Sequence, residues 1–128
     1  MKVAKKLLIP LLSLALFLGL FNTVFFWGYI PSSSMEPTIH KGDVILGLRL
    51  FRELHNGDII IFERDGRYLV KRIAASSGDS IAIDGASFLV PEKSFYVLGD
   101  NASDSFDSRF WSDPFVPLSN VIARVIAK

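Results

Sequence analysis

The longest apolar segment of the chain runs from Leu7 to Ile30 without a charged residue, and it limits the fold more than any other feature. Its only clearly polar side chains are those of Ser13, Asn22 and Thr23. About 20 apolar residues in a helix cross the hydrocarbon core of a bilayer, so a helix over this segment is long enough to span a membrane. We therefore expect residues 1–30 to form a short N-terminal stub and a transmembrane anchor.

A cleaved secretory signal is the alternative for this segment. The apolar part of such a signal is usually about 7–15 residues long and ends in a small-x-small cleavage site. The apolar run here is longer, and no Ala-x-Ala sequence follows it before Pro31. Lys2, Lys5 and Lys6 precede the run with no acidic residue among them, which predicts a cytoplasmic N-terminus. We expect a single-pass protein of the cytoplasmic (inner) membrane with residues 31–128 outside the cytoplasm.

Composition restricts the partners of the segment beyond the anchor. The chain has 128 residues and a formal net charge of +1, and three of its cations lie in the N-terminal stub. Residues 31–128 carry no basic stripe of the kind that nucleic-acid binding requires, so we expect no nucleic-acid partner. The chain has no cysteine, which excludes disulfides and thiol chemistry.

The segment beyond the anchor is predicted to be mostly β. Asn56-Gly57, Asp65-Gly66 and Asp84-Gly85 are residue pairs that suit type I′ hairpin turns, and each lies between apolar or β-branched runs. No sustained helical period follows Ile30. We predict a compact antiparallel β domain over residues 31–128. The predicted strands are Val44–Leu50, Asp58–Glu63, Arg67–Ala74, Ser80–Ile83, Phe95–Leu98 and Val121–Ile126.

A serine-rich turn, Pro31-Ser32-Ser33-Ser34-Met35-Glu36-Pro37-Thr38, directly follows the anchor. The two prolines disfavour helix, and serine hydroxyls in such a turn commonly bond to local backbone, so a plain linker is one interpretation. Ser34 lies four residues past Ile30, at most about 14 Å from the predicted end of the span. The other interpretation is that Ser34 is a hydroxyl nucleophile held near the membrane surface.

A serine nucleophile needs a base, and a strand supplies a candidate. Alternation over Arg67–Ala74 places Leu69, Lys71 and Ile73 on one face of the strand. Burial among apolar neighbours lowers the pKa of a lysine, so a neutral Lys71 could accept a proton. The alternative is a lysine whose ammonium group reaches solvent. Two histidines are weaker candidates: His40 is near Ser34 in sequence, and His55 adjoins a turn.

A third polar segment runs from Gly99 to Arg109 and holds several acidic side chains. Calcium binding is one hypothesis, but the EF-hand spacing fails because position six lacks glycine and Trp111 stands where the bidentate glutamate belongs. Asn101-Ala102-Ser103 is a glycosylation sequon that we attribute to chance. We expect no metal and no other cofactor.

The three segments, in this order, resemble the type I signal peptidases, a family of membrane serine proteases with a serine–lysine pair. The matching residues are the serine turn with Gly42-Asp43 after it, Tyr68–Ile73 with Gly78-Asp79 after it, and Gly99-Asp100-Asn101 followed by Ser105 to Arg109. Ser33, where the family often has glycine, and Ala75-Ser76-Ser77 depart from the pattern.

The resemblance implies a role for individual residues. Ser34 would be the nucleophile and Lys71 the general base, with the Ser32 hydroxyl and the Ser34 amide stabilising the oxyanion. Ser105 would orient the Lys71 amine. Asp107 and Arg109 would form an ion pair that Asp100 joins. The family's shallow substrate pockets correspond here to Ile30, Met35, Ile39, Ile45 and Val70, several of which could equally be core. Phe110, Trp111, Phe115 and Val116 are either a lipid-contacting patch or core.

The implied function is the removal of signal peptides from translocated preproteins by a membrane-anchored serine endopeptidase that acts as a monomer. Only about 20 residues separate Gly78-Asp79 from Gly99-Asp100, so the chain resembles a short form of the family. A peptidase dedicated to a single pilin or to one conjugation or export substrate is an alternative. Two others are a non-catalytic β module tethered to the membrane and a self-cleaving repressor, which the apolar run disfavours.

Overall fold

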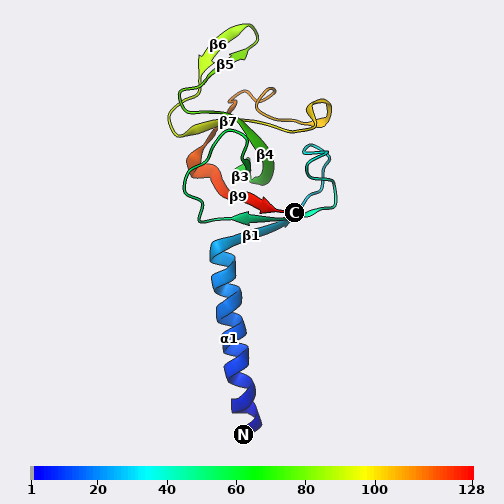
Figure 1. Ribbon diagram of the computed structural model, residues 1–128, viewed down its shortest axis with the longest axis vertical. Coiled ribbons are helices and arrows are strands. Elements are labelled where there is room, and N and C mark those ends of the chain that lie inside the picture. Colours follow the sequence, from blue (N-terminus) through cyan, green and yellow to red (C-terminus); the bar gives the residue numbers. More distant parts are fainter. Residues whose placement is uncertain (1) are drawn as a thin grey trace.

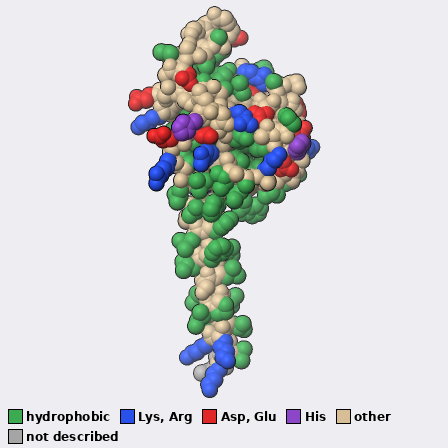
Figure 2. Space-filling view, in the orientation of Figure 1, with side chains coloured by type: hydrophobic (Ala, Val, Ile, Leu, Met, Phe, Trp, Pro, Cys, Tyr) green, Lys and Arg blue, Asp and Glu red, His purple; other side chains and the backbone are tan. Residues whose placement is uncertain are grey.

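One long helix precedes a head of β-strands in the computed structural model, which describes residues 2–128 (Figure 1). The helix, α1 (Lys2–Val24), has no buried residue, and its length and composition allow it to cross a membrane. Figure 2 shows apolar side chains along its whole length and basic side chains at its free end. The head, residues 25–128, stands at the other end of α1 and contains the chain's C-terminus (Figure 1).

The predicted anchor is too long at its C-terminal end. The helix stops at Val24, and the last part of the apolar run forms strand β1 (Phe25–Tyr29), which pairs antiparallel with β2 (Val44–Leu48). Ile30 is buried in the head. An apolar run alone does not distinguish a membrane helix from a buried strand, and aromatic residues such as Phe26 and Trp27 favour the strand.

Seven strands form one antiparallel sheet in the order β1-β2-β9-β3-β4-β7-β8, and a separate hairpin, β5–β6, projects from the head (Figure 1). The prediction of a mostly antiparallel β fold is therefore confirmed. The six predicted strands are all present, and β1, β6 and β8 were missed. The remaining bounds are β3 (Ile59–Arg64), β4 (Arg67–Ser76), β5 (Ser80–Ile83), β6 (Ala86–Leu89), β7 (Ser94–Leu98), β8 (Phe115–Pro117) and β9 (Val121–Ala127), with 3₁₀ turns η1 (Ala102–Asp104) and η2 (Leu118–Asn120).

Two of the three predicted hairpin turns join paired strands. Asp65-Gly66 links β3 to β4 and Asp84-Gly85 links β5 to β6, and all four residues have the positive φ of a type I′ turn. The prediction for Asn56-Gly57 was wrong, because only Gly57 has a positive φ and the preceding strand pairs with β1 and β9 instead of β3.

Alternation along the strands separates two apolar clusters on the two faces of the sheet. Ile60 and Phe62 of β3 pack into one cluster with Ile73 of β4, whereas Ile61 packs into the other. Leu69 contacts the first cluster and Val70 the second, so β4 alternates as predicted. Lys71 therefore points to the same face as Leu69 and Ile73.

The aromatic segment near the C-terminus is divided between core and surface. Val116 is buried, Trp111 packs against the first apolar cluster, and the Phe115 ring lies 6.5 Å from that of Tyr96. Phe110 is exposed. The core interpretation is therefore confirmed for Val116 and Trp111, whereas lipid contact by Phe110 stays a prediction.

Candidate active site

Lys71 is a buried lysine in the middle of β4. Its exposed fraction is 4%, and its amine donates a hydrogen bond of 3.1 Å to the Ser105 hydroxyl. Burial lowers the pKa of Lys71, with the nearby positive charge of Arg109 acting in the same direction and the Asp107 carboxylate opposing both. A lysine in these surroundings is easier to deprotonate than one in water.

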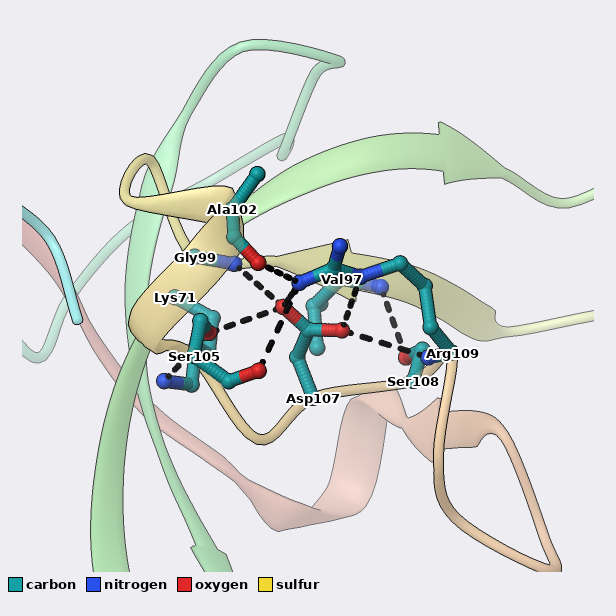
Figure 3. A network of polar contacts seen from close by, with 8 residues as sticks. All are labelled: Lys71, Val97, Gly99, Ala102, Ser105, Asp107, Ser108 and Arg109. Atoms are coloured by element: carbon teal, nitrogen blue, oxygen red, sulfur yellow. Dashed lines mark hydrogen bonds and ion pairs between the residues drawn. The ribbon is translucent and has the colours of Figure 1, made fainter.

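Ser105, Asp107 and Arg109 form a hydrogen-bonded network behind the lysine (Figure 3). The Ser105 hydroxyl donates to Asp107 Oδ2 over 2.8 Å, and the predicted ion pair joins Arg109 Nε to Asp107 Oδ1 over 2.9 Å. The loop that carries these residues is fastened to β7, because the Val97 amide donates to the Ser108 hydroxyl. The network thus fixes the position of the Ser105 oxygen that faces Lys71.

Asp107 is completely buried, yet it is held as a carboxylate. Burial acts to raise the pKa of Asp107, but hydrogen bonds from Arg109, the Gly99 amide and Ser105 outweigh burial and keep this pKa below its usual range. Both oxygens of the carboxylate are occupied by these donors. Asp107 is therefore a fixed negative charge that does not contact the Lys71 amine directly.

The serine turn is clamped to the segment that follows β7. The Asn101 amide donates to the Ser34 carbonyl over 2.9 Å, the Asn101 side chain donates to the Ser33 carbonyl over 3.1 Å, and the Ser33 hydroxyl bonds to Asp104. A Cβ on Gly99 would lie 2.6 Å from the Ser34 carbonyl oxygen and 2.0 Å from the Ser105 hydroxyl, so only glycine fits there. No sequence signal indicated these structural roles of Asn101 and Gly99.

Asp100 belongs to a different network from the predicted one. It forms a two-pronged ion pair with Arg72, at 2.8 and 2.7 Å, and accepts a hydrogen bond of 2.6 Å from Thr38. The hydrogen bonds from Arg72 hold the pKa of Asp100 below its usual range. Because Arg72 follows Lys71 in β4, this second network ties the serine turn to the strand that carries the lysine. As the residue next to Lys71 in a strand, Arg72 points to the opposite face, but no sequence signal indicated its pairing with Asp100.

Ser34 and Lys71 face the same two cavities. An apolar cavity of about 310 Å³ is bounded by β1, the serine turn and β4, and an open cavity of about 1070 Å³ lies beside the loop over residues 103–112. Ser32, Ser34, Leu69 and Lys71 line both cavities. Within residues 2–128 no hydrogen bond joins the Ser34 hydroxyl to the Lys71 amine, and the Ser34 oxygen instead accepts one of 3.3 Å from Ser32.

Four of the five residues predicted for substrate binding line the apolar cavity, namely Ile30, Met35, Ile45 and Val70. Ile39 is the exception, because it is buried in the second apolar cluster and lines neither cavity. His40 and His55 are exposed and also lie outside both cavities. With α1 ending at Val24, Ser34 is ten residues from the helix, so chain length alone limits their separation only to about 33–36 Å.

A comparison with protein families shows to which family this chain belongs. The family model described as "Signal peptidase, peptidase S26" matches residues 2–89 and 84–128, which together cover nearly the whole chain. The chain belongs to the signal peptidase family. In this signal peptidase, Ser34, Lys71 and Ser105, one residue from each of the three matching segments, line the open cavity together.

Individual relatives show how far the likeness extends. Signal peptidase I of Leptolyngbya laminosa is 30% identical over 91% of this chain and 74% of its own length. Thylakoidal processing peptidase 1 of Arabidopsis thaliana is 31% identical over 76% of this chain, a match that spans only 39% of the plant protein. A Staphylococcus aureus protein named inactive signal peptidase IA is 34% identical over 63% of this chain. The family and these relatives make the chain a membrane serine peptidase that cleaves signal peptides.

Proposed function

We propose that this signal peptidase is a membrane-anchored serine endopeptidase that removes N-terminal signal peptides from translocated preproteins. Ser34 is the nucleophile and Lys71 is the general base. The observation that carries the assignment is a buried lysine of lowered pKa that faces the same cavities as the serine. Both side chains come from one chain, so a monomer can supply the whole pair, and the apolar surface of α1 holds the enzyme in the bilayer.

The direction of the hydrogen bonds supports this role for Lys71. The single hydroxyl hydrogen of Ser105 is donated to Asp107, so the Ser105 oxygen can only accept a hydrogen bond from Lys71. The lone pair of a neutral Lys71 is then free to take a proton from Ser34. Catalytic hydrogen bonds are often long before substrate binds, which is compatible with the missing Ser34–Lys71 bond.

The reaction follows from these positions. The Ser34 oxygen attacks the scissile carbonyl while its proton passes to Lys71, and the resulting oxyanion accepts hydrogen bonds from the Ser34 amide and the Ser32 hydroxyl. A side-chain donor in this position contributes about 3–4 kcal/mol to transition-state stabilisation. The Lys71 ammonium then protonates the leaving amine, and the neutral amine later activates the water that hydrolyses the acyl-enzyme.

The apolar cavity is suited to the residues that precede the scissile bond. Its volume of about 310 Å³ and its lining by Ile30, Met35 and Val70 match small apolar side chains. An extended peptide can reach it as a strand beside the free edge of β1, which is one of the two outer strands of the sheet. Ser34 and Lys71 border this cavity.

The direct test is to replace each proposed catalytic residue in the full-length chain in detergent. We expect Ser34→Ala and Lys71→Met each to lower preprotein cleavage by about 10³-fold or more while the protein stays folded. Cleavage that survives either change at near the wild-type rate would exclude the proposed pair. Wild-type protein that cleaves no preprotein would instead favour a non-catalytic module, the alternative that the inactive staphylococcal relative keeps open.

A further inference from the structure

Two exposed aromatic rings stand beside the proposed catalytic network. Phe106 is 68% exposed and Phe110 is 58% exposed, and their rings stack 5.9 Å apart with an angle of 8° between them. The Trp111 and Phe106 rings form a T-shaped pair with their centroids 6.5 Å apart. Exposed clusters of this kind commonly mark binding sites, because a ligand that covers them removes apolar surface from water and so lowers the free energy of the complex. We call Phe106, Phe110 and Trp111 the aromatic shelf.

The aromatic shelf is fixed in position by the residues around it. Phe106 lies between Ser105 and Asp107, both of which are buried and hydrogen-bonded to each other. Trp111 packs against the first apolar cluster and carries the Arg64 guanidinium 4.1 Å above its ring. The exposed rings are therefore presented by a rigid loop, and little conformational entropy is lost when they bind a ligand.

The aromatic shelf lines the open cavity, together with Ser34 and Lys71. This cavity of about 1070 Å³ has room for several residues of a peptide, and it joins the apolar cavity at the two proposed catalytic side chains. The open cavity is thus continuous with the place where the scissile bond must lie.

The two cavities correspond to the two sides of that bond. The apolar segment of a signal peptide precedes the scissile bond and lies in the membrane, and the apolar cavity is bounded by β1, which directly follows α1. The residues before the bond therefore occupy the apolar cavity. The residues after the bond, which begin the mature protein, then lie in the open cavity.

Charged residues in the open cavity disfavour lipid as the occupant. Asp65, Arg67 and Asp104 line the same cavity as the aromatic shelf, and the Asp65 side chain is 93% exposed. Carboxylates are costly in hydrocarbon, whereas they are easily tolerated beside a hydrated peptide.

We propose that the aromatic shelf is a subsite for an aromatic or large aliphatic side chain among the first residues of the mature protein. The inference rests on the proposed function, and it adds a preference on the leaving-group side of the cleavage site. An extended peptide advances about 3.3 Å per residue, so the preference is confined to the first few positions.

The test uses full-length protein in detergent and a preprotein whose first five mature residues are alanine. A single phenylalanine is placed at each of these positions in turn, and kcat/KM is measured for every substrate. We expect about a threefold to tenfold increase at one position, or at two alternate positions, because alternate side chains of a strand share a face. Equal rates for all substrates would overturn the proposal.

Phe106→Ala is expected to remove this preference, so that the ratio of kcat/KM for the phenylalanine and alanine substrates falls to about one. The matched control is Phe88→Ala, because Phe88 is also exposed but lies on β6 and lines neither cavity. This control should retain the preference. An equal loss of rate on every substrate in Phe106→Ala, or a loss seen only in lipid vesicles, would contradict the subsite and indicate a positioning or membrane role.

A binding measurement separates failure of the subsite from failure of the proposed function. In a Ser34→Ala, Trp27→Phe protein, Trp111 is the remaining tryptophan and reports on peptides that carry the mature sequence. We expect the phenylalanine peptide to bind at least threefold more tightly than the alanine peptide. Equal affinities would refute the subsite even if no preprotein were cleaved.

Discussion

At the scale of single residues, the burial of Lys71 lowers the stability of the folded protein and at the same time makes the amine a better base. The amine lies in an almost dry position, where its charged form is disfavoured relative to the unfolded chain. Protonation of the folded protein therefore costs free energy that the unfolded chain does not pay. The same cost makes the neutral amine available as a base.

Two pH dependences follow for Lys71. Cleavage should increase with pH until the amine has lost its proton, as measured by kcat/KM in detergent. The pKa of Lys71 in the folded protein lies below its unfolded value near 10.5. Between these two pKa values the unfolded chain binds more protons, so the free energy of unfolding of the wild type should rise with pH in that window.

Lys71→Met lacks this titration, so its free energy of unfolding relative to wild type should be greatest at low pH and should decline as the pH rises. The total decline should be about 1.4 kcal/mol for each pH unit by which folding lowers the pKa of Lys71. Thermal or denaturant unfolding of both proteins across pH 6–11 measures the difference. A difference that does not change with pH would mean that the lysine is not perturbed by burial.

Asn101 tests whether the clamp on the serine turn matters for catalysis. Asn101→Ala removes the side-chain hydrogen bond to the Ser33 carbonyl and leaves the backbone bond to Ser34. We expect kcat to fall by about tenfold with little change in KM, because small displacements of a nucleophile are costly. Steady-state cleavage kinetics provide the measurement.

Asn120→Ala is the matched control, because Asn120 also donates to a backbone carbonyl, that of Glu63, but lies outside both cavities. Each variant loses about 1 kcal/mol of hydrogen bonding, so their stabilities should be similar. Equal kcat values for the two variants would show that Asn101 contributes to stability alone.

At the scale of elements, β1 links the anchor to the proposed active site. It follows α1 directly, forms one of the two outer strands of the sheet and borders the apolar cavity. Its neighbour β2 is held by both β1 and β9. The position of the apolar cavity relative to the anchor thus depends on close packing in this part of the sheet.

Gly47 of β2 marks that close packing. An added Cβ would lie 2.8 Å from the Ala123 Cβ and 3.0 Å from the Ile61 Cδ1. Gly47→Ala should therefore lower the free energy of unfolding by about 1–3 kcal/mol, as measured by denaturant unfolding. Val44→Ala, at an exposed position of the same strand, should change it by less than about 0.5 kcal/mol. Equal stability of the two variants would show that the sheet yields at Gly47.

At the scale of the whole molecule, the proposed function requires the head and the N-terminal lysines to lie on opposite sides of the membrane. The chain has no cysteine, so single cysteines can be introduced as unambiguous reporters. Ser119 lies exposed in the head, and Val3 lies exposed near the free end of α1.

In intact cells, a membrane-impermeant maleimide should label Ser119→Cys, and it should label Val3→Cys only after the membrane is permeabilised. The reason is the run of lysines at the free end of α1, which favours the cytoplasm. Labelling of Val3→Cys in intact cells, with Ser119→Cys protected, would reverse the proposed orientation.

The sequence predicted the elements whose signals are local. The alternation in β4 and the Asp-Gly turns after β3 and β5 depend on neighbouring residues, and the structure has them as predicted. The exact end of the anchor was missed, because the apolar residues of β1 continue the helix signal without a break. Ile39 was assigned to a substrate pocket because it is near Ser34 in sequence, whereas its side chain turns into the core.

By itself, the sequence determined the kinds of chemistry present: an apolar helix, a serine turn, a lysine in an apolar strand and a polar loop. Only the tertiary structure decided which of them meet. The pairing of Asp100 with Arg72, the clamp of Asn101 on the serine turn and the exposed aromatic shelf all join residues through space. Such contacts depend on how the strands are ordered in the sheet, and strand order is set by the packing of the whole core.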